Sequence, residues 1–463
     1  MDPKIAQIEE KPKVHWHIWL IIVIVSIIVV PLVVAFVFYT LRGNSNSQKN
    51  QDNNSGNTSN NGSNSNNNNP NQYTLDCVPR GHDNYRSEDT FVIDPTDSKI
   101  MYIAVEYKGV FKSTDSGSTW ERITDGISAY PSAKGGKCYQ EMGKLLIDSK
   151  NHNRLLLSRV ESPGLITDPF SENAGLYLSM DGGMNWKQLV KGSMNASGSR
   201  AIGFDYDDSI TIYYGTNNMA ASWGGADPNK YFNTVGTLYK SLDNGNTWLE
   251  LKTGIEKSLR ATSLVVDNQN HNRVILGNFR VSGVENDPNL NPDQSKDLLM
   301  TEDGGNVWSN ISNRMPKAAG IINILQSKNN GNNFVIVGQS IKSSDPSPLF
   351  YSNDNLQTIK QASITSIYAI AFDPTSVKGN RILAYAPFMG NKNIYESNDA
   401  GKTWKAYASF PSYIDGSKVR ISNFVWDTKS KNVIYANGDN GYLLKSTDNG
   451  ITWSKVISQE DLK

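Results

Sequence analysis

Seven copies of one eight-residue pattern run through this chain and limit its possible architecture more than any other feature. The pattern is Ser/Thr-x-Asp-x-Gly-x-Thr-Trp: one copy, STDSGSTW, covers residues 113–120, and a divergent copy, SNDNLQTI, covers residues 352–359. The central aspartates are spaced by 66, 62, 60, 51, 45 and 49 residues, the period of a four-stranded propeller blade with its loops. These aspartates are Asp115, Asp181, Asp243, Asp303, Asp354, Asp399 and Asp448.

Each copy has the composition of a β-hairpin tip. Aspartate accepts hydrogen bonds from the backbone of its own turn, and glycine supplies the positive φ that a tight turn requires. The tryptophan that follows starts the next strand and is expected to bury a large apolar ring. A calcium site is the competing interpretation, but one carboxylate per tip falls short of the about six to eight oxygens that calcium prefers. We therefore expect no metal and no cofactor.

Short apolar or alternating runs surround each copy. In the last unit they are ISNFVW, NVIYAN, GYLLKS and WSKVIS, which predicts a four-stranded antiparallel meander. An aspartate closes the first run in six units, and an arginine precedes the second run in three. Because they recur so regularly, we expect framework roles for them rather than a catalytic cluster. They are Asp94, Asp148, Asp205, Asp267, Asp373 and Asp427, with Arg154, Arg273 and Arg381.

The repeated pattern resembles the Asp-box (BNR) repeat, and each copy is called an Asp box below. Known carriers include sialidases, xyloglucan-active glycoside hydrolases, sortilin-type receptor domains and a photosystem II assembly factor. The resemblance covers roughly residues 86–463 and implies an all-β, seven-bladed β-propeller of four-stranded antiparallel blades. Sialidases fit least, because that fold has six blades. The resemblance implies no single function, since its carriers do unrelated things.

An uncharged apolar stretch covers residues 18–41. At 1.5 Å per residue it reaches about 36 Å, enough to cross a hydrocarbon core of about 30 Å. A cleaved signal peptide is the alternative, but its apolar region is normally about 7–15 residues long and ends in a small-residue site. We therefore expect residues 1–17 to be a short cytoplasmic tail and residues 18–41 to be a single transmembrane helix that acts as a signal anchor.

An Asn-, Ser- and Gly-rich stretch follows at residues 42–72 and is too polar to pack, which predicts a flexible linker before a propeller at residues 73–463. The charge difference across the apolar stretch is slight. A propeller on a stalk at the extracytoplasmic side of the cell membrane is nevertheless the simplest interpretation. Candidate N-glycosylation sites are Asn53, Asn57, Asn61, Asn195 and Asn310, although sequons also arise by chance in an Asn-rich run.

Charge and cysteine content narrow the possible partners. The chain has 45 basic and 45 acidic side chains, so no electrostatic argument favours nucleic acid as a partner. Its two cysteines are Cys77, just before the first blade, and Cys138, in the connection to the second blade. An external location permits a disulfide between them that ties the first segment to the ring. Two unpaired thiols are the alternative.

Strand alternation puts all Asp boxes on one face of the ring and the long irregular segments on the other, where function usually lies. The segments are residues 124–140, 160–175, 216–236, 279–297 and 339–348. Ligand-binding candidates there are Trp223, Asp227, Tyr231, Glu285 and Asp287, with Arg200, Arg260 and Arg420 expected to converge at the mouth of the central channel. Each has a structural alternative: a tryptophan caps its own loop, a carboxylate is solvated, and an arginine pairs with a neighbouring carboxylate.

Two functional classes remain open. The first is a binding or assembly module that holds a protein or glycan partner at the cell surface. The second is an extracellular glycoside hydrolase, which needs two carboxylates about 5–9.5 Å apart. The sequence has no His- or Cys-rich metal cluster, no Gly-rich phosphate loop and no Gly-x-Ser-x-Gly motif. We therefore predict a membrane-anchored binding module, with the hydrolase as the alternative.

Overall fold

The computed structural model describes residues 90–131, 137–139, 142–159, 173–191, 197–205, 210–217, 236–254, 259–279, 296–316, 320–340, 345–390, 392–438 and 441–462. The chain divides into two compact units, Met1–Asn69 and Pro70–Lys463, and all described residues belong to the second. The expected tail, membrane helix and linker lie outside the described residues. Within the described part, no helix is long and apolar enough to cross a membrane.

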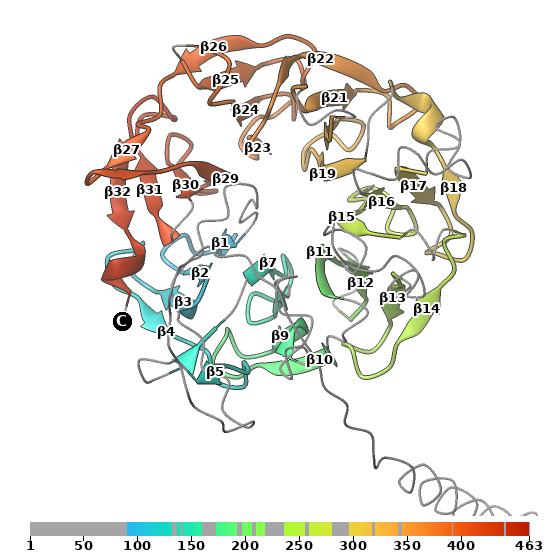
Figure 1. Cartoon of the computed structure of the whole chain (residues 1–463), viewed down its shortest axis with the longest axis horizontal. Helices are drawn as coiled ribbons and strands as arrows, with labels where there is room; N and C mark the ends of the chain where they lie inside the picture. The colour runs from blue at the N-terminus through green and yellow to red at the C-terminus, as the bar shows by residue number, and fades with distance from the viewer. Residues whose placement is uncertain are drawn as a thin grey trace, which may run out of the picture. The chain divides into compact units, whose positions relative to one another are not determined.

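Seven four-stranded antiparallel sheets form the blades of a propeller, as expected (Figure 1). Blade 1 is β1 (Phe91–Ile93), β2 (Met101–Val105), β3 (Gly109–Ser113) and β4 (Glu121–Arg122). Blade 2 is β7 (Met142–Ile147), β8 (Leu155–Arg159), β9 (Gly175–Ser179) and β10 (Lys187–Lys191). Blade 3 is β11 (Ser197–Phe204), β12 (Ile212–Asn217), β13 (Leu238–Ser241) and β14 (Leu249–Leu251).

The remaining blades repeat this order. Blade 4 is β15 (Ala261–Val266), β16 (Val274–Asn278), β17 (Leu298–Thr301) and β18 (Ser309–Asn310). Blade 5 is β19 (Ile321–Gln326), β20 (Phe334–Gly338), β21 (Pro348–Ser352) and β22 (Lys360–Thr365). Blade 6 is β23 (Ala369–Phe372), β24 (Ile382–Tyr385), β25 (Ile394–Ser397) and β26 (Lys405–Ala408). Blade 7 is β29 (Ile421–Trp426), β30 (Ile434–Gly438), β31 (Leu443–Ser446) and β32 (Ser454–Ile457).

Burial explains why the strands have these compositions. The second strands of blades 1, 2, 4, 5 and 7 are buried at every position, because neighbouring blades cover both faces of the sheet. Short outer strands such as β4 and β18 are exposed and polar. One hydrophobic cluster fills each of the seven blade–blade interfaces. The core is therefore a ring of seven inter-blade layers, and the first strand of each blade lines the centre (Figure 1).

The ring closes between blades 7 and 1 without exchange of a strand, since every blade is one continuous stretch of chain. Asn437 Nδ2 donates to Thr90 Oγ1 at 2.7 Å across this junction. The chain then ends in a short 3-10 helix, η9 (Gln459–Asp461), which is followed by Leu462. Gln459 Nε2 donates to the Glu106 carbonyl at 3.1 Å, and Leu462, only 2% exposed, joins the core between the last and first blades.

Three smaller elements lie outside the blade sheets. They are the hairpin β5 (Tyr130–Pro131) with β6 (Lys137–Cys138), the hairpin β27 (Tyr413–Ile414) with β28 (Ser417–Lys418), and the 3-10 helix η7 (Ser312–Arg314). Cys138 is fully buried, and the described residues include no free cysteine. Its expected partner, Cys77, lies outside the described residues, so their pairing remains a prediction.

The expected burial of the Asp-box tryptophans was only partly right. Trp186 alone is fully buried, because its indole N–H donates to the Ile123 carbonyl of the preceding blade connection at 2.8 Å. The other five are half-buried. In four of these the indole N–H donates to the glycine carbonyl of its own hairpin tip, as Trp120 does to Gly117 at 3.0 Å. Part of each of these indole side chains remains exposed to solvent.

Candidate functional site

The Asp boxes occupy the turns between third and fourth strands, and their carboxylates are fully engaged within the turn. In the first box, Asp115 Oδ1 accepts from the Ser113 hydroxyl and the Thr119 N–H, both at 2.8 Å, while Oδ2 accepts from the Thr119 hydroxyl at 2.6 Å. The Thr119 hydroxyl is the main reason that the pKa of Asp115 is lowered to about 2. The hydroxyl-to-aspartate bond recurs in all seven boxes, at 2.7–2.8 Å.

The boxes have a structural role in the described part of the chain. No group of three or more His, Cys, Asp or Glu side chains that could hold a metal lies within the described ranges. The boxes instead join neighbouring blades. Lys112 Nζ of blade 1 donates to the Gly182 carbonyl in the box of blade 2 at 3.3 Å, and Lys240 Nζ of blade 3 donates to Gly304 in the box of blade 4 at 3.0 Å. The sequence pattern did not reveal this clipping role.

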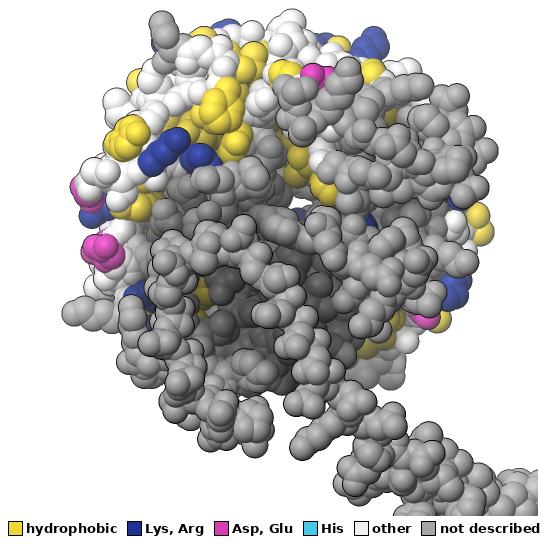
Figure 2. All heavy atoms as spheres, viewed as in Figure 1, with side chains coloured by type: hydrophobic (Ala, Val, Ile, Leu, Met, Phe, Trp, Pro, Cys, Tyr) yellow, Lys and Arg dark blue, Asp and Glu magenta, His cyan; other side chains and the backbone are white. Residues whose placement is uncertain are grey.

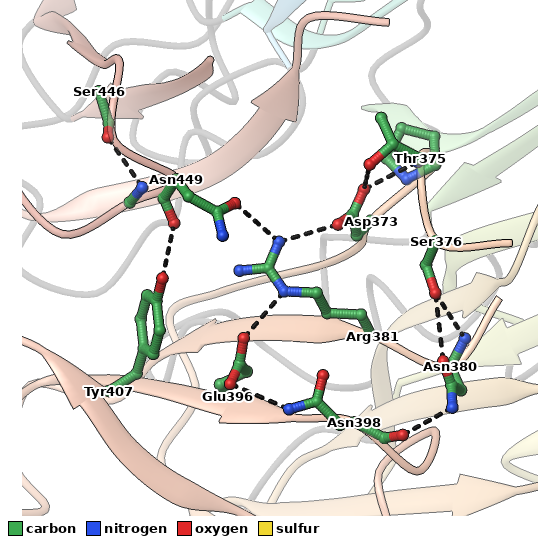
Figure 3. Close-up of polar contacts among 12 residues, drawn as sticks. Asp373, Thr375, Ser376, Asn380, Arg381, Glu396, Asn398, Tyr407, Ser446 and Asn449 are labelled. Atoms are coloured by element: carbon green, nitrogen blue, oxygen red, sulfur yellow. Dashed lines mark hydrogen bonds and ion pairs between the residues drawn. The ribbon is translucent and has the colours of Figure 1, made fainter. Parts of the chain in front are cut away.

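The recurring Asp and Arg residues are framework residues, as predicted. Arg381 Nη1 donates to Asp373 Oδ2, and its Nε donates to Glu396 Oε1, both at 2.8 Å (Figure 3). Burial lowers the pKa of Arg381, but the two carboxylates outweigh burial and raise it overall. Arg154 pairs in the same way with Asp148 at 2.9 Å, and Arg273 with Asp267 at 3.3 Å.

The closing aspartates hold the first turn of each blade. Asp94 Oδ1 accepts from the Thr96 N–H at 2.8 Å, and Asp427 Oδ1 accepts from the Lys429 N–H at the same distance. His152 from the turn of blade 2 lies 3.0 Å from Asp94, which adds another contact between blades. The Asp-box face thus consists of structural contacts, and the opposite face, called the loop face below, remains the place to search for a ligand site.

The structure describes only part of the predicted ligand-binding set. Trp223, Asp227, Tyr231, Glu285 and Asp287 lie outside the described residues, as do four of the five candidate glycosylation sites. The remaining one, Asn310, is exposed on the outermost strand of blade 4, and its Oδ1 accepts from the Ser312 hydroxyl at 2.7 Å. Arg200 lies in β11, where the pairing with β12 is irregular between Gly198 and Ile202.

Arg260 and Arg420 occupy equivalent positions, each directly before the innermost strand of its blade. They belong to blades 4 and 7, so they lie on nearly opposite sides of the ring. Arg260 is partly buried, and burial lowers its pKa to about 10. The expected convergence of the arginines at the mouth of the central channel stays a prediction.

A group of aromatic residues on the loop face of blades 6 and 7, called the aromatic patch below, was not predicted. It contains Phe388, which is 69% exposed, and the partly buried Tyr368. Tyr413, which is 65% exposed, is counted with them because it lies in the connection from blade 6 to blade 7 on the same face. The rings of Tyr368 and Phe388 pack edge to face, with centroids 5.7 Å apart. Figure 2 shows hydrophobic side chains gathered over the part of the ring that holds β23–β27, next to Lys and Arg side chains.

Tyr413 reaches this face on the β27–β28 hairpin. Asp415 and Gly416 form its turn with φ of 50° and 78°, the backbone of a type I′ turn. The Asp-Gly pair between Tyr413 and Lys418 was the sequence signal for this hairpin. It lies in a connection that was not among the long segments considered above.

Comparison with known proteins agrees with this architecture. Residues 444–455, which include the last Asp box, match the BNR/Asp-box repeat family. The match agrees with the seven-bladed propeller and its recurring Asp boxes. A xyloglucanase of a Paenibacillus species is 26% identical to it over 186 residues, which cover 36% of this chain and 16% of the relative.

Two solved structures extend the comparison of folds. A GH74 enzyme of Niastella koreensis superimposes on the Asp-box propeller with a TM-score of 0.57 and 14% identity, covering 81% of this chain and 54% of that chain. YCF48 from Cyanidioschyzon merolae gives a TM-score of 0.45 and 13% identity, covering 78% of this chain and 94% of the other. The chain thus spans about half of the GH74 structure and much less of the curated relative. At 14% identity the likeness to the GH74 enzyme concerns the fold alone.

Three described carboxylates at the loop-face end of the Asp-box propeller already have structural roles. Asp415 pairs with Lys455 at 2.5 Å, and Asp461 accepts from the Ser458 N–H at 2.7 Å. Asp297 is only 2% exposed. Other described carboxylates on this face, such as Asp125 and Asp345, are exposed to solvent.

Proposed function

We propose that the chain is a binding module that holds a glycan or a protein partner against its loop face, at the cell surface. The single observation that carries this proposal is the aromatic patch. Contiguous exposed apolar patches mark interaction sites, and aromatic residues are among the commonest anchors of binding interfaces. The 18–41 helix would hold the module at the membrane, and the 42–72 linker would let it reach its partner.

A glycan is favoured over a protein by two considerations. Flat aromatic faces such as those of Phe388 and Tyr413 present the apolar surface that sugar rings stack upon. The relatives described above include a xyloglucanase, which acts on a polysaccharide by its name. Those relatives are longer than this chain, so their activity is not transferred with the fold.

The second candidate is a glycoside hydrolase, favoured by the same relatives. It requires a pair of carboxylates about 5–9.5 Å apart on either side of the scissile bond. Asp227, Glu285 and Asp287 are the carboxylates to substitute first in that case. Release of reducing ends from a polysaccharide by the purified chain would decide for the hydrolase.

The first test is a glycan-array and polysaccharide-hydrolysis screen with the full-length chain. Binding without cleavage is the expected result. Replacing both Phe388 and Tyr413 with Ala should weaken binding to the best glycan about tenfold or more, because each contributes a hot-spot contact. Val377→Ala is the matched control, since Val377 is 90% exposed but lies in a turn of the Asp-box face.

Two results would count against the binding proposal or its details. Cleavage would replace it with the hydrolase. Unchanged affinity after the double substitution would exclude the aromatic patch as the binding surface. Trp223→Ala and Tyr231→Ala test the longest loop in the same screen, with an expected loss of roughly 1–3 kcal/mol if they are anchors. Membrane fractionation and protease protection of intact cells test the anchor and its orientation independently.

A further inference from the structure

The backbone of Arg260 makes two hydrogen bonds, while its side chain has no partner among the described residues. Its N–H donates to Asn278 Oδ1 at 2.7 Å, and its carbonyl accepts from the Phe279 N–H at 3.1 Å. Its guanidinium makes no hydrogen bond or ion pair with the residues that the structure describes. Burial is the sole cause that lowers its pKa to about 10, so the group remains charged at neutral pH without a described counter-ion.

A second polar group without a partner lies on the same rim of the ring. Phe279 forms a β-bridge with Gly320 of the next blade, and the Gly320 carbonyl accepts from the Gln339 N–H at 2.9 Å. Gln339 Oε1 is buried and has no hydrogen-bond partner in the described structure. Arg260, Phe279, Gly320 and Gln339 therefore form one hydrogen-bonded row, called the blade 4/5 rim below.

Both groups are costly to leave without partners. A buried acceptor that lacks a hydrogen bond costs about 1–3 kcal/mol, and a partly buried guanidinium is best satisfied by two oxygens of one oxyanion. Natural structures keep few such groups, and those that remain call for an explanation. At one end of this rim the charged Arg260 guanidinium can donate hydrogen bonds, and at the other end Gln339 Oε1 can accept one.

The ligand that satisfies both ends must carry a negatively charged oxyanion and a hydroxyl donor. Three backbone steps of about 4.8 Å separate Arg260 from Gln339, so the ligand is longer than a small ion. Phe279, which is partly exposed, lies between them in the row. A chain of sugar units bearing carboxylates has all of these properties.

The charge distribution at the centre of the ring favours the same ligand. The described innermost strands, β1, β7, β11, β15, β19, β23 and β29, contain Lys144 and Arg200 but no Asp or Glu. The chain as a whole has no net charge. These strands therefore contribute basic residues but no acidic ones, a composition that favours an anionic over a cationic ligand.

We propose that the blade 4/5 rim binds an acidic sugar unit of a polysaccharide, with Arg260 holding the carboxylate and Gln339 Oε1 accepting a sugar hydroxyl. This inference rests on the proposed function in one respect, namely that the partner is a glycan. It adds the chemical class of that glycan and a second contact surface beside the aromatic patch.

The test is a calorimetric titration of the full-length chain with polygalacturonate and with a neutral galactan of matched length. Polygalacturonate should bind more tightly, and its affinity should fall as salt is added, because a charge pair is screened. Arg260→Gln should weaken binding to polygalacturonate about tenfold or more while leaving galactan binding unchanged. Arg260→Lys should keep part of the affinity, since the charge stays but the two-pronged geometry is lost.

Two further variants complete the design. Gln339→Leu removes the acceptor and should weaken binding to both polymers about three- to tenfold. Lys402→Gln is the matched control, because it removes an exposed cation from the Asp-box face and should change nothing. If Arg260→Gln does not fold, as judged by its thermal melt, the polymer preference of the wild type and of Arg260→Lys still decides the question.

Several outcomes would overturn this inference. They are equal affinity for the two polymers, an equal loss for both polymers in Arg260→Gln, or an acidic peptide that binds better than polygalacturonate. If a neutral glycan binds through the aromatic patch and polygalacturonate does not bind, this inference fails and the proposed function stands. If the full-length chain binds no glycan at all, the glycan form of the proposed function fails as well.

Discussion

Arg381 Nη1 of blade 6 donates a hydrogen bond to Asn449 Oδ1, in the Asp box of blade 7, at 2.9 Å (Figure 3). The same guanidinium holds Asp373 and Glu396 of its own blade. Tyr407 adds a parallel link, because its hydroxyl donates to the Asn449 carbonyl at 3.1 Å. One side chain therefore neutralises two buried carboxylates and also joins two blades.

Substitution of Arg381 should be strongly destabilising. Asp373 and Glu396 have side chains only 5% and 7% exposed, so removing their common partner leaves Asp373 without its ion pair and Glu396 with only the exposed Lys405. We expect Arg381→Gln to lower the free energy of unfolding by about 3–5 kcal/mol, as measured by urea denaturation. Lys405→Gln is the matched control: Lys405 also pairs with Glu396 at 2.8 Å, but it is 65% exposed, so a loss of about 0–1 kcal/mol is expected. Similar losses for the two variants would contradict this account.

The Asp boxes should make stability depend on pH in the acidic range. Hydrogen bonds lower the pKa of Asp115 and Asp448 to about 2, led by the hydroxyls of Thr119 and Thr452. An unfolded aspartate titrates near about 3.9, so the box contribution is complete above that pH and is lost as the pH falls towards 2. The melting temperature should therefore drop across this window. Asp448→Asn should show a shallower drop than the wild type, and identical pH profiles would argue against the assignment.

Two glycines with similar backbone angles should respond very differently to alanine. Gly126 has φ of 88°, and an added Cβ would lie 1.9 Å from the Trp186 carbonyl oxygen. Gly416 has φ of 78°, but an added Cβ would meet nothing within 4 Å. We expect Gly416→Ala to cost about 1–2 kcal/mol from backbone strain alone, and Gly126→Ala to cost more than about 4 kcal/mol. Equal melting temperatures for the two variants would show that the blade 1–2 connection can relax.

Leu462 should matter more than its terminal position suggests. It is 2% exposed and packs in the layer between blades 7 and 1. Leu462→Ala should cost about 2–5 kcal/mol, as for other buried leucines. Glu460→Gln, an exposed neighbour, should cost little. If Leu462→Ala is neutral in chemical denaturation, the C-terminal segment does not help to close the ring.

The expected Cys77–Cys138 bond has a direct test. Mass spectrometry of unreduced peptides should find the two residues linked, since an external location favours the bond. Free thiols at both positions would refute it. Reduction should lower the melting temperature of the linked protein, because the bond restricts the unfolded chain.

The repeats were sufficient to predict the blades, and local chemistry explains why. Each Asp box depends on residues within eight positions of one another, so its turn is visible in the sequence. The strand sequences beside it are apolar throughout where sheets cover both faces, and they alternate between buried and partly exposed residues elsewhere. Even the divergent copy at residues 352–359 forms the same bond, with the Ser352 hydroxyl donating to Asp354 at 2.8 Å.

Contacts between blades were much harder to foresee. Lys112 and Gly182 are 70 residues apart, and their hydrogen bond follows from the angle between two sheets rather than from a local pattern. The same holds for the blade 4/5 rim, since the bridge from Phe279 to Gly320 spans two blades. Arg260 was identified in the sequence because it precedes a strand, whereas Gln339 had no such signal. The aromatic patch was missed because only the longest loops were considered.

The closure between blades 7 and 1 relies on side chains and on the C-terminal segment rather than on a shared sheet. A force applied to the two ends of the propeller would load this seam directly, with Asn437, Thr90 and Leu462 as the first contacts to break. The remaining blades would then open one after another, each exposing one apolar layer. Each blade is one continuous stretch of chain, so a cut in any connection between blades leaves every sheet whole. The order of the blades along the chain could therefore be permuted without dividing a sheet.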